Sequence, residues 1–432
     1  MPEAWRNWSR ELSCTPAAIE RPRTAAELGA VVARAATAGQ RVRVSASGHS
    51  FSEIALTDGV MVRLDHLDRL LGVDVERGLV RVEAGIVLAE LSRRLDSLGL
   101  GLENLGDIDR QTLGGAIATA THGTGSRYRN LSSQVEALEL VGADGTLLEL
   151  SERSDPGAFR AARVGLGSLG IVYSVTLRAL PAFTLRRVDR PRPLEEVLAD
   201  LDSIEADCDH FEFYVFPHTG TALCRETVRL GDAAPQPCNR ATEWAREVAL
   251  ENGAGAALAA VARRFPGRAP ALARLGSAGF GRSTKIDRSH RVFASDRRVR
   301  FTEMEYSIPR EAMVSTLREV LAVAARPRHA VAFPIEVRFV AADNALLSPS
   351  FERDACYVAV HHDRALGWSG YFREVEAAMR ERDGRPHWGK RHFREAADLA
   401  PLYPRWEDFA AVRERLDPGR VFSNAYIDRV LG

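Results

Sequence analysis

The sequence contains 432 residues, of which 45% are hydrophobic, and a chain of this length can form two domains with substantial cores. Its 58 basic and 58 acidic residues balance, which argues against nucleic acid or another polyanion as a partner. The five cysteines are odd in number and share no metal-ligand spacing, so we expect a reduced, cytoplasmic chain without a metal site.

We expect neither a signal peptide nor a membrane-spanning helix. The N-terminus, MPEAWRNWSRELS, is charged and lacks the apolar segment of a signal peptide. The most apolar helical stretch, GAGAALAAVA, is too short to cross a bilayer, so we expect no membrane span. No feature of the sequence specifies an oligomeric state.

The first 180 residues show a mixed pattern of helices and strands. Strands are predicted over residues 40–48, 59–65, 78–85 and 170–180, and helices over 24–39, 87–99 and 155–165. Residues 135–151 predict a hairpin that turns at Ala143-Asp144-Gly145. Beyond residue 181, strands such as 210–217 and 332–340 alternate with long helices and loops, and residues 413–432 are expected to return to the first domain.

Residues 165–170, GLGSLG, match the pattern GxGxxG but lie in the wrong context for a nicotinamide-dinucleotide site. In such sites the glycines follow a strand and open a helix, whereas here a helix precedes them and a strand follows. The motif therefore predicts a tight turn whose backbone lies near a cofactor.

Two other segments are unusually rich in small residues, namely residues 45–52, SASGHSFS, and residues 104–128. Small side chains let consecutive backbone N–H groups approach an anion, so both loops are candidates for phosphate binding. The second loop contains GG, ATAT and HGTG, more small residues than an ordinary turn requires.

Three further sites carry candidate chemistry. Glu336 and Arg338 lie two apart on a predicted strand and share a face, which fits either a buried ion pair or a binding site whose flanking Phe333 and Phe339 limit water. Lys390 is one of only two lysines, the other 56 basic residues being arginines, and it follows His387 in RPHWGKRH.

The third site is the end of a strand. His361 and His362 are adjacent there, so they point to opposite faces and form a poor bidentate metal site.

In chain order, the stretches SGHSFSEIALTDG, ENLGDIDRQTLGG, THGTG, PIEVRFVAADNALLS, GRPHWGKRH and LDPGRVFSNAY resemble the FAD-linked aldonolactone oxidoreductases of the vanillyl-alcohol-oxidase type. The resemblance runs from about residue 20 to the C-terminus and is weakest over residues 181–300. It implies an α+β fold of two domains: an FAD-binding domain, residues 1–180 completed by about 411–432, and a substrate (cap) domain, residues 181–410.

The same resemblance implies roles for individual residues. His49 occupies the position that is joined covalently to the flavin 8α-methyl carbon, and Ile171 that of a backbone contact to the cofactor. Glu336 and Arg338 match the substrate-binding pair, with Glu336 orienting hydroxyls or acting as base, and Lys390 matches a lysine beside the flavin. The expected cofactor-binding residues are Ser45, Ala46, Ser47, Gly48, His49, Ser50, Phe51, Gly106, Asp107, Gly114, Gly115, Thr121, His122, Gly123, Thr124, Gly125, Ile171 and His387.

The implied reaction is oxidation of a sugar-1,4-lactone of the L-gulono type by hydride transfer to flavin N5. Gly106 matches the position at which glycine admits oxygen and alanine obstructs it, so O2 is the expected acceptor and hydrogen peroxide the product. The neighbouring Asp107 departs from the small residues of some relatives.

Three alternatives stay open. The substrate could be D-arabinono-1,4-lactone or an alditol such as xylitol, whose oxidases carry a histidine where this chain has Ala359, although His361 shares that face. The acceptor could be a quinone or cytochrome. The protein could also bind flavin without turnover, which the set of Glu336, Arg338 and Lys390 argues against.

Overall fold

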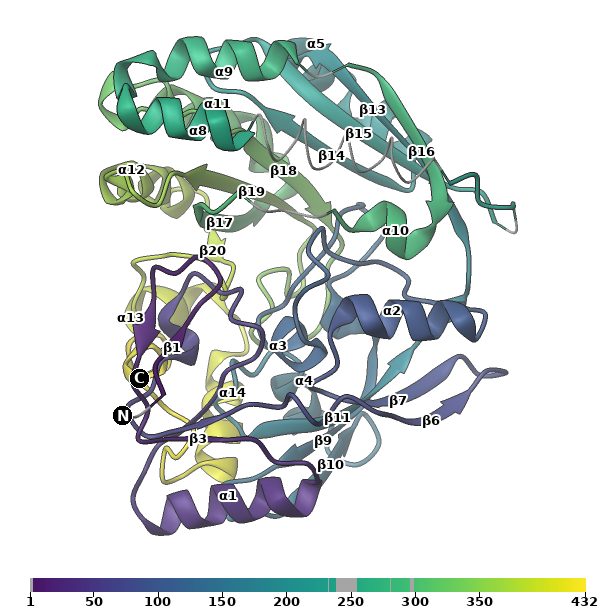
Figure 1. The fold of residues 1–432 in the computed structure, drawn as a ribbon, viewed down its shortest axis with the longest axis vertical. Coiled ribbons are helices and arrows are strands. Elements are labelled where there is room, and N and C mark those ends of the chain that lie inside the picture. Colours follow the sequence, from purple (N-terminus) through teal and green to yellow (C-terminus); the bar gives the residue numbers. More distant parts are fainter. Residues whose placement is uncertain (1–2, 232, 238–254, 280, 296–298) are drawn as a thin grey trace.

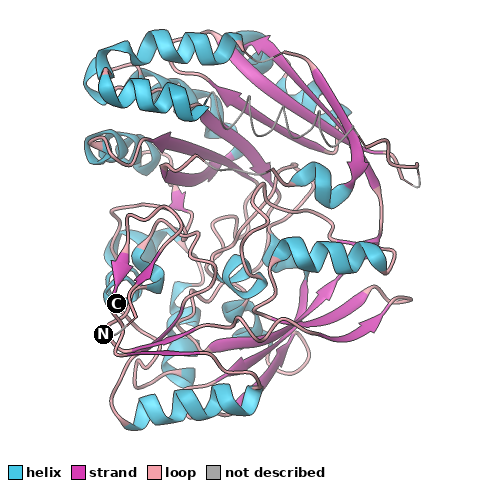
Figure 2. Cartoon of the chain, in the orientation of Figure 1, coloured by secondary structure: helices cyan, strands magenta, loops and turns pink. Residues whose placement is uncertain are grey.

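The computed structural model describes residues 3–231, 233–237, 255–279, 281–295 and 299–432 (Figure 1). Two stacked halves are visible along the long axis, each containing both helices and strands (Figure 2). The mixed α+β fold predicted from the sequence is confirmed. Within the described residues, no helix has the length and apolar character needed to cross a membrane.

The first half contains three of the sheets. A parallel sheet has the order β3-β5-β4, an antiparallel sheet the order β10-β9-β11-β7-β6, and β1 pairs with β2. Its elements are β1 (Trp5–Arg6), β2 (Ser13–Cys14), β3 (Ala18–Glu20), α1 (Ala25–Thr37), β4 (Val42–Val44), β5 (Val60–Val62), β6 (Leu70–Asp74), β7 (Leu79–Glu83), α2 (Leu88–Ser97), β8 (Leu100–Gly101), α3 (Leu113–Ala118), β9 (Val135–Val141), β10 (Leu147–Ser151), α4 (Pro156–Ala162) and β11 (Ile171–Arg178).

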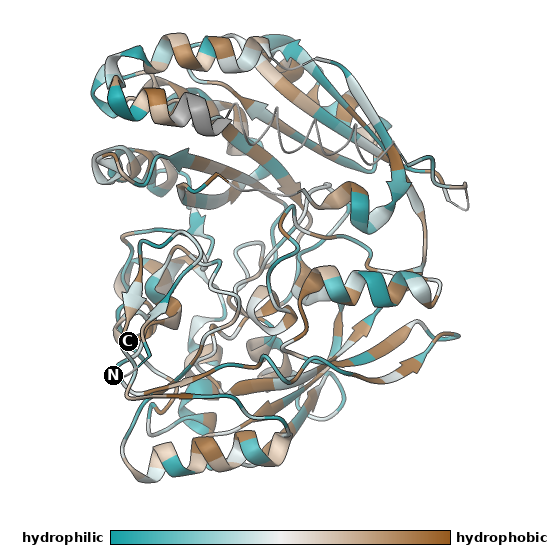
Figure 3. Ribbon diagram, viewed as in Figure 1, coloured by the Kyte–Doolittle hydropathy of each residue, from teal (hydrophilic) through white to brown (hydrophobic). Residues whose placement is uncertain are grey.

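Local sequence signals account for these elements. The side chain of Thr24 caps α1 by accepting a hydrogen bond from the N–H of Glu27, and Asp155 caps α4 in the same way. Figure 3 shows hydrophobic and hydrophilic positions alternating along α1, as expected for a helix with one face on the core. The predicted helices, strands and β9–β10 hairpin of this half are confirmed.

The second half is built on an eight-stranded sheet of order β16-β13-β15-β14-β18-β19-β17-β20, and β12 pairs with β8 of the first half. Its elements are β12 (Leu180–Pro181), β13 (Thr184–Pro193), α5 (Leu194–Ala199), α6 (Leu201–Asp207), β14 (His210–Val215), β15 (Thr221–Arg229), α8 (Gly255–Arg264), α9 (Ala269–Ala278), β16 (Ser283–Arg288), α10 (Ser289–Phe293), β17 (Thr302–Pro309), α11 (Met313–Ala324), β18 (Ile335–Val340), β19 (Ala355–His362), α12 (Trp368–Arg380) and β20 (Arg385–Pro386).

The two faces of this sheet differ in chemistry, because successive side chains on a strand point to opposite sides. One set of positions packs with α5, α6, α11 and α12 into an apolar core; in β18 these residues are Ile335, Val337 and Phe339. The alternate positions are polar and face the first half. The acidic, basic and histidine residues of this polar face include Glu212, Glu303, Glu305, Glu336, Arg338 and His361. The sheet therefore presents a face of charged side chains to the first half.

The C-terminal segment, with α13 (Ala396–Leu399), α14 (Trp406–Leu416) and α15 (Ala425–Leu431), packs into the core of the first half. Arg43 of β4 links the C-terminal segment to the first half. Its buried guanidinium donates hydrogen bonds to the carbonyl oxygens of Ile54, Leu166, Gly167 and Phe422. Chain segments more than 350 residues apart thereby meet at the end of β4, from which the first small-residue loop emerges.

Candidate active site

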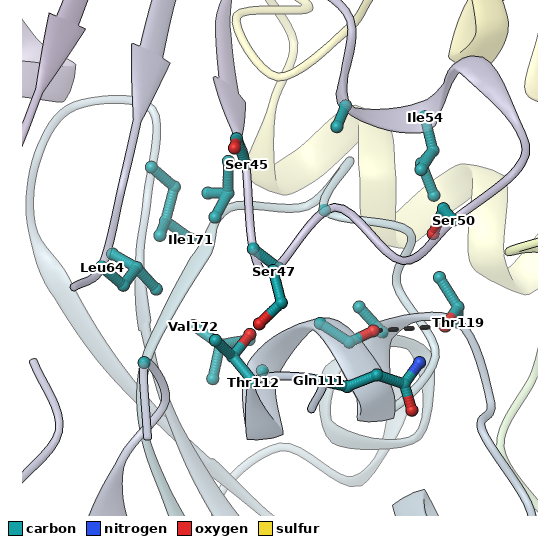
Figure 4. A pocket seen from close by; sticks show the side chains of 18 of the residues that line it. Ser45, Ser47, Ser50, Ile54, Leu64, Gln111, Thr112, Thr119, Ile171 and Val172 are labelled. Atoms are coloured by element: carbon teal, nitrogen blue, oxygen red, sulfur yellow. Dashed lines mark hydrogen bonds between the residues drawn. The ribbon is translucent and has the colours of Figure 1, made fainter. Parts of the chain in front are cut away.

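A cavity of about 500 Å³ lies in the first half, a volume typical of cofactor sites. Figure 4 shows Ser45 and Ser47 on the first small-residue loop, opposite Gln111 and Thr112 of the second. Of the expected cofactor residues, those that line this cavity are Ser45, Ala46, Ser47, Gly48, His49, Ser50, Gly114, Gly115 and Ile171.

Close packing between the two loops explains their small side chains. A Cβ atom on Gly115 would lie 2.7 Å from the Cβ of Ala46, so a larger residue would push the loops apart. Gly48 has φ of +70°, a left-handed conformation that favours glycine, and it lies against Trp5.

The cavity also contains an unsatisfied donor. Ser45 is 1% exposed, and within the described part of the chain its hydroxyl has no hydrogen-bond partner. Buried hydroxyls nearly always have one, so this oxygen is suited to an anionic ligand such as a pyrophosphate. The donor, the volume and the glycine-rich lining fit FAD, the cofactor expected from the sequence.

The GLGSLG turn connects α4 to β11, as predicted, and its glycines line the same cavity. Gly167 has φ of +63° and Gly170 has φ of +147°. A Cβ atom on Gly170 would lie 2.7 Å from the carbonyl oxygen of Val141 on β9. The motif therefore forms a tight turn that lets backbone approach the cofactor space.

A second cavity, of about 90 Å³, adjoins the first and reaches the polar face of the eight-stranded sheet. His49, Ser50, Gln111 and Thr119 line both cavities, so the first loop lies at their junction. The other predicted site residues that line the second cavity are Phe51, Gly106, Asp107, Thr121, His122, Glu336, Arg338, His387 and Lys390.

The last three predicted residues lie where the second loop meets the sheet. Gly123 and Thr124 line a space of about 30 Å³ that also contacts Arg338. Gly125 donates its N–H to the carbonyl oxygen of Phe339 at 2.8 Å. They join the two halves, and their direct contact with FAD stays a prediction.

Glu336 and Arg338 form both an ion pair and part of the cavity wall. Arg338 Nη2 lies 2.5 Å from Glu336 Oε1, and Arg338 Nε donates to Glu212 Oε2 at 2.8 Å. Burial opposes the charge on Arg338, but Glu336 and Glu212 hold its pKa well above the ordinary value. The site therefore keeps a permanent cation whose orientation is set from two sides.

The expectation that Phe339 limits water around this pair is wrong. Phe339 is an odd-numbered residue of β18 and packs on the helix side, in the apolar core. Tyr214 takes that place instead, with its hydroxyl 3.0 Å from Glu336 Oε1. Phe333 contacts Phe301, which lines the second cavity.

Lys390 lies in a turn held against both halves. Its Nζ is 2.5 Å from Glu303 Oε2, and the carbonyl oxygen of Gly389 accepts the N–H of Phe51 at 2.7 Å. Burial would raise the pKa of Glu303, but the charge of Lys390, followed by His361, lowers it to about 2. The ammonium therefore enters the cavity beside a fully ionised carboxylate.

His49 is held as a neutral imidazole. Burial, then the positive charges of Lys390 and Arg110, lower its pKa to about 4. Trp8 stacks on the ring with a centroid separation of 5.6 Å and an interplanar angle of 26°. At neutral pH a ring nitrogen therefore keeps the lone pair needed for nucleophilic attack.

His122, Glu305 and His387 form a buried cluster whose polar atoms lie within 4.8 Å of one another. His387 Nδ1 accepts the N–H of Gly389 at 3.0 Å, so the hydrogen of its neutral ring is on Nε2. Burial lowers the pKa of His387 to about 3 and keeps this form. A protonated Nε2 cannot ligate a metal, so the geometry favours a hydrogen-bonded cluster.

The sequence analysis missed several residues of the second cavity, namely Trp8, Phe301, Glu303 and Glu305. Glu303 and Glu305 lie two apart on β17, the same spacing as Glu336 and Arg338 on β18. The same spacing of charged residues in TEMEYSIP could have indicated that Glu303 and Glu305 also face the site. His361 pairs directly with Glu303 in the register of β17 and β19.

The chain is similar to known proteins over its whole length. Residues 175–430 match the family described as D-arabinono-1,4-lactone oxidase, and residues 16–151 match the FAD binding domain. The chain is 49% identical to L-gulono-1,4-lactone dehydrogenase of Mycobacterium tuberculosis, with all of both chains covered. It is 37% identical to L-gulonolactone oxidase of Bos taurus, covering 99% of this chain and 98% of the relative.

More distant similarities agree on the fold. An alditol oxidase of a Streptomyces strain is 33% identical, with all of both chains covered. The crystal structure of cholesterol oxidase from B. sterolicum superposes with a TM-score of 0.82 at 18% identity, covering 100% of this chain and 97% of that chain. At that identity the second likeness concerns the fold alone, the two-domain arrangement of vanillyl-alcohol-oxidase-type flavoproteins.

Proposed function

Because the chain belongs to the FAD-linked aldonolactone oxidoreductases, we propose that it oxidises a sugar-1,4-lactone of the L-gulono-1,4-lactone type. The observation that carries this proposal is the second cavity. Glu336, Arg338 and Lys390 line a space that adjoins, at His49, a cavity suited to FAD. When bound, FAD supplies the acceptor for a hydride removed from a carbinol carbon.

The loops of the first half would hold FAD. Residues 45–50 and the start of α3 form two walls of its cavity, and Ser45 offers a free donor. We place the FAD-binding domain at residues 1–180 with about 411–432, and the substrate domain at residues 181–410. The two cores of the molecule support a division into two domains with the C-terminal segment in the first, although α13, which precedes residue 411, packs with the first half together with α14 and α15.

We also propose a covalent bond between an imidazole nitrogen of His49 and the flavin 8α-methyl carbon. Its support is the position of His49 at the junction of the two cavities, together with a pKa of about 4 that keeps the ring neutral. The two electrons released when this C–N bond replaces a C–H bond would leave with the external acceptor.

In the second cavity the protein's own charges would bind and polarise the substrate. Arg338 is suited to stabilise negative charge that develops on the substrate oxygen. Glu336 accepts hydrogen bonds through Oε1 and leaves Oε2 for a substrate hydroxyl. Lys390 lies beside Glu303, where a localised cation can stabilise negative charge on the reduced cofactor.

For the electron acceptor we propose O2, with hydrogen peroxide as product, because Gly106 lines the second cavity without a side chain. The name of the Mycobacterium tuberculosis relative, a dehydrogenase, supports a second candidate, an acceptor other than oxygen.

A substrate panel tests the proposal. Purified holoenzyme is mixed anaerobically with L-gulono-1,4-lactone, D-arabinono-1,4-lactone or xylitol, and reduction is followed by the loss of flavin absorbance. The reduced protein is then mixed with oxygen or with an artificial acceptor. Fast reduction by a lactone and slow reduction by xylitol are expected. Failure of every lactone and polyol to reduce the flavin would refute the proposal.

A further inference from the structure

Oxidation of a carbinol releases the proton of its hydroxyl as well as a hydride, so the second cavity needs a group that accepts a proton. Such a group must present an unshared electron pair to the cavity and must be able to hold the proton. The titratable residues that line the cavity on its sheet side are Glu303, Glu305, Glu336, His361, His387 and Lys390, with His49, Asp107 and His122 opposite.

Most of these groups are unsuited to the task. Ion pairing holds the pKa of Glu303 at about 2, and His122 holds that of Glu305 well below its ordinary value. Burial holds the pKa of His387 at about 3, so its ring does not keep a proton at neutral pH. His122 turns Nε2 toward Glu305 Oε1 at 3.3 Å, with Nδ1 on the carbonyl oxygen of Gly123.

Glu336 is occupied in a different way. Its Oε1 contacts both Arg338 Nη2 and the hydroxyl of Tyr214, so this carboxylate holds Arg338 in the cavity and has only Oε2 left to orient a substrate hydroxyl. Asp107 is engaged as well, since its Oδ1 accepts the hydroxyl of Ser295 at 2.6 Å.

His361 has the required arrangement. Its Nδ1 lies 3.1 Å from the carbonyl oxygen of Pro334, and a carbonyl only accepts, so Nδ1 carries the hydrogen. In the neutral ring Nε2 is then unprotonated, and it faces the cavity 3.6 Å from Glu303 Oε1 and 4.0 Å from Glu336 Oε2. Two carboxylates around this nitrogen would stabilise the imidazolium once it forms.

In a Ser-His-Asp triad, too, a hydrogen bond fixes one ring nitrogen and leaves the other to accept a proton. There a carboxylate accepts the hydrogen of Nδ1, whereas in His361 a backbone carbonyl oxygen does so. The ring of His361 is also held in place, because Phe301 packs edge-on against it at a centroid separation of 4.9 Å.

We propose that His361 is the general base of the reaction, an inference that rests on the proposed function. The substrate O–H bond breaks and its proton passes to His361 Nε2, while the electron pair of that bond forms the C=O double bond. The C–H bond breaks at the same carbon, and its hydrogen leaves with both electrons to FAD. Glu336 and Arg338 position the hydroxyl.

The test uses holoenzyme with wild-type residues, His361→Ala and His362→Gln. His362 is the matched control because it is adjacent, buried and on the opposite face, where its ring contacts the carbonyl oxygen of His329. Anaerobic reduction by the best lactone is measured from pH 5 to pH 9 by stopped flow. Glu303, Lys390, Glu336 and Arg338 face the imidazole from three neighbouring elements and are unchanged in all three proteins.

In wild type we expect the reduction rate to rise with pH through one ionisation and then level off, because only the neutral imidazole accepts a proton. In His361→Ala the maximal rate should fall about 100-fold or more and lose this pH dependence. Added imidazole should restore part of the rate, which a purely structural role would not allow. His362→Gln should keep the wild-type profile.

A second measurement does not depend on turnover. The ¹⁵N resonances of the histidine rings, assigned by their absence in His361→Ala, should show the hydrogen of His361 on Nδ1. A neutral ring with its hydrogen on Nε2, or a His361→Ala variant reduced at the wild-type rate at every pH, would overturn the inference. If wild type itself is reduced by no lactone or polyol, the proposed function fails and the inference fails with it.

Discussion

Replacing Lys390 with methionine tests the central electrostatic feature of the second cavity. The substitution removes the ammonium that lies 2.5 Å from Glu303 Oε2. Burial opposes ionisation of Glu303, yet its pKa is about 2 instead of 4.5, with Lys390 the largest favourable contribution. That difference corresponds to about 3 kcal/mol of folding stability when the carboxylate is ionised.

The sign of the pH dependence follows from the lowered pKa. The contribution is complete above pH 4.5 and is lost as the pH falls through about 2, the pKa of folded Glu303. Lys390→Met should therefore unfold with a free energy up to about 3 kcal/mol lower at pH 7, and the deficit should shrink as the pH falls below 4.5. Urea unfolding at several pH values measures it.

The effect on catalysis is separable from this loss. Removing a charge that stabilises a developing anion typically slows the chemical step by about 100- to 1,000-fold. Lys285→Met, which changes the only other lysine, should leave flavin reduction unchanged. In the double variant Lys390→Met/Glu303→Gln no unpaired carboxylate is buried, so stability should recover relative to Lys390→Met while reduction stays slow. Reduction by the double variant as fast as by Glu303→Gln alone would refute the catalytic role.

Three further predictions concern residues of the two cavities. His49→Ala should release its flavin on acid precipitation while wild type stays yellow; free FAD in the wild-type supernatant would contradict the covalent bond. Arg338→Met should keep its flavin but slow anaerobic reduction about 100-fold, because the developing alkoxide loses its cation; a lower melting temperature with an unchanged rate per folded molecule would indicate a purely structural pair. Gly106→Ala places a Cβ 3.1 Å from the carbonyl oxygen of His122, so reoxidation by O2 should slow about tenfold, or ~1.4 kcal/mol, with lactone reduction unaffected; equal reoxidation rates would show that this position does not control oxygen access.

Much of the first half could be predicted from the sequence because its signals are local. Capped helices, a short hairpin turn and two loops of small residues can each be recognised from a stretch of about 25 residues or fewer. The free hydroxyl of Ser45 illustrates the limit of such signals. Its loop was predicted, but the lack of a partner depends on chain segments far away in the sequence.

The second cavity was harder to predict because its contacts are long-range. Lys390 and Glu303 are 87 residues apart, and Glu336 meets Tyr214 across 122 residues. A pair of acids on one strand indicates only that they share a face. Which face is buried, and against what, depends on the pairing of β17 with β19 and of β14 with β18.

The charge pattern of the sheet nevertheless carries information about the site. An acidic side chain is seldom buried without a cation or several hydrogen bonds, so period-two acids in apolar strands require partners from elsewhere. In the structure Glu336 has Arg338, Glu303 has Lys390 and Glu305 has His122. Each of these three carboxylates thus holds one cationic or titratable group at the cavity wall. A substrate rich in hydroxyls can replace part of that hydrogen bonding, which an apolar ligand cannot do, so the polar face itself favours a sugar-like substrate over the sterol of the structural neighbour.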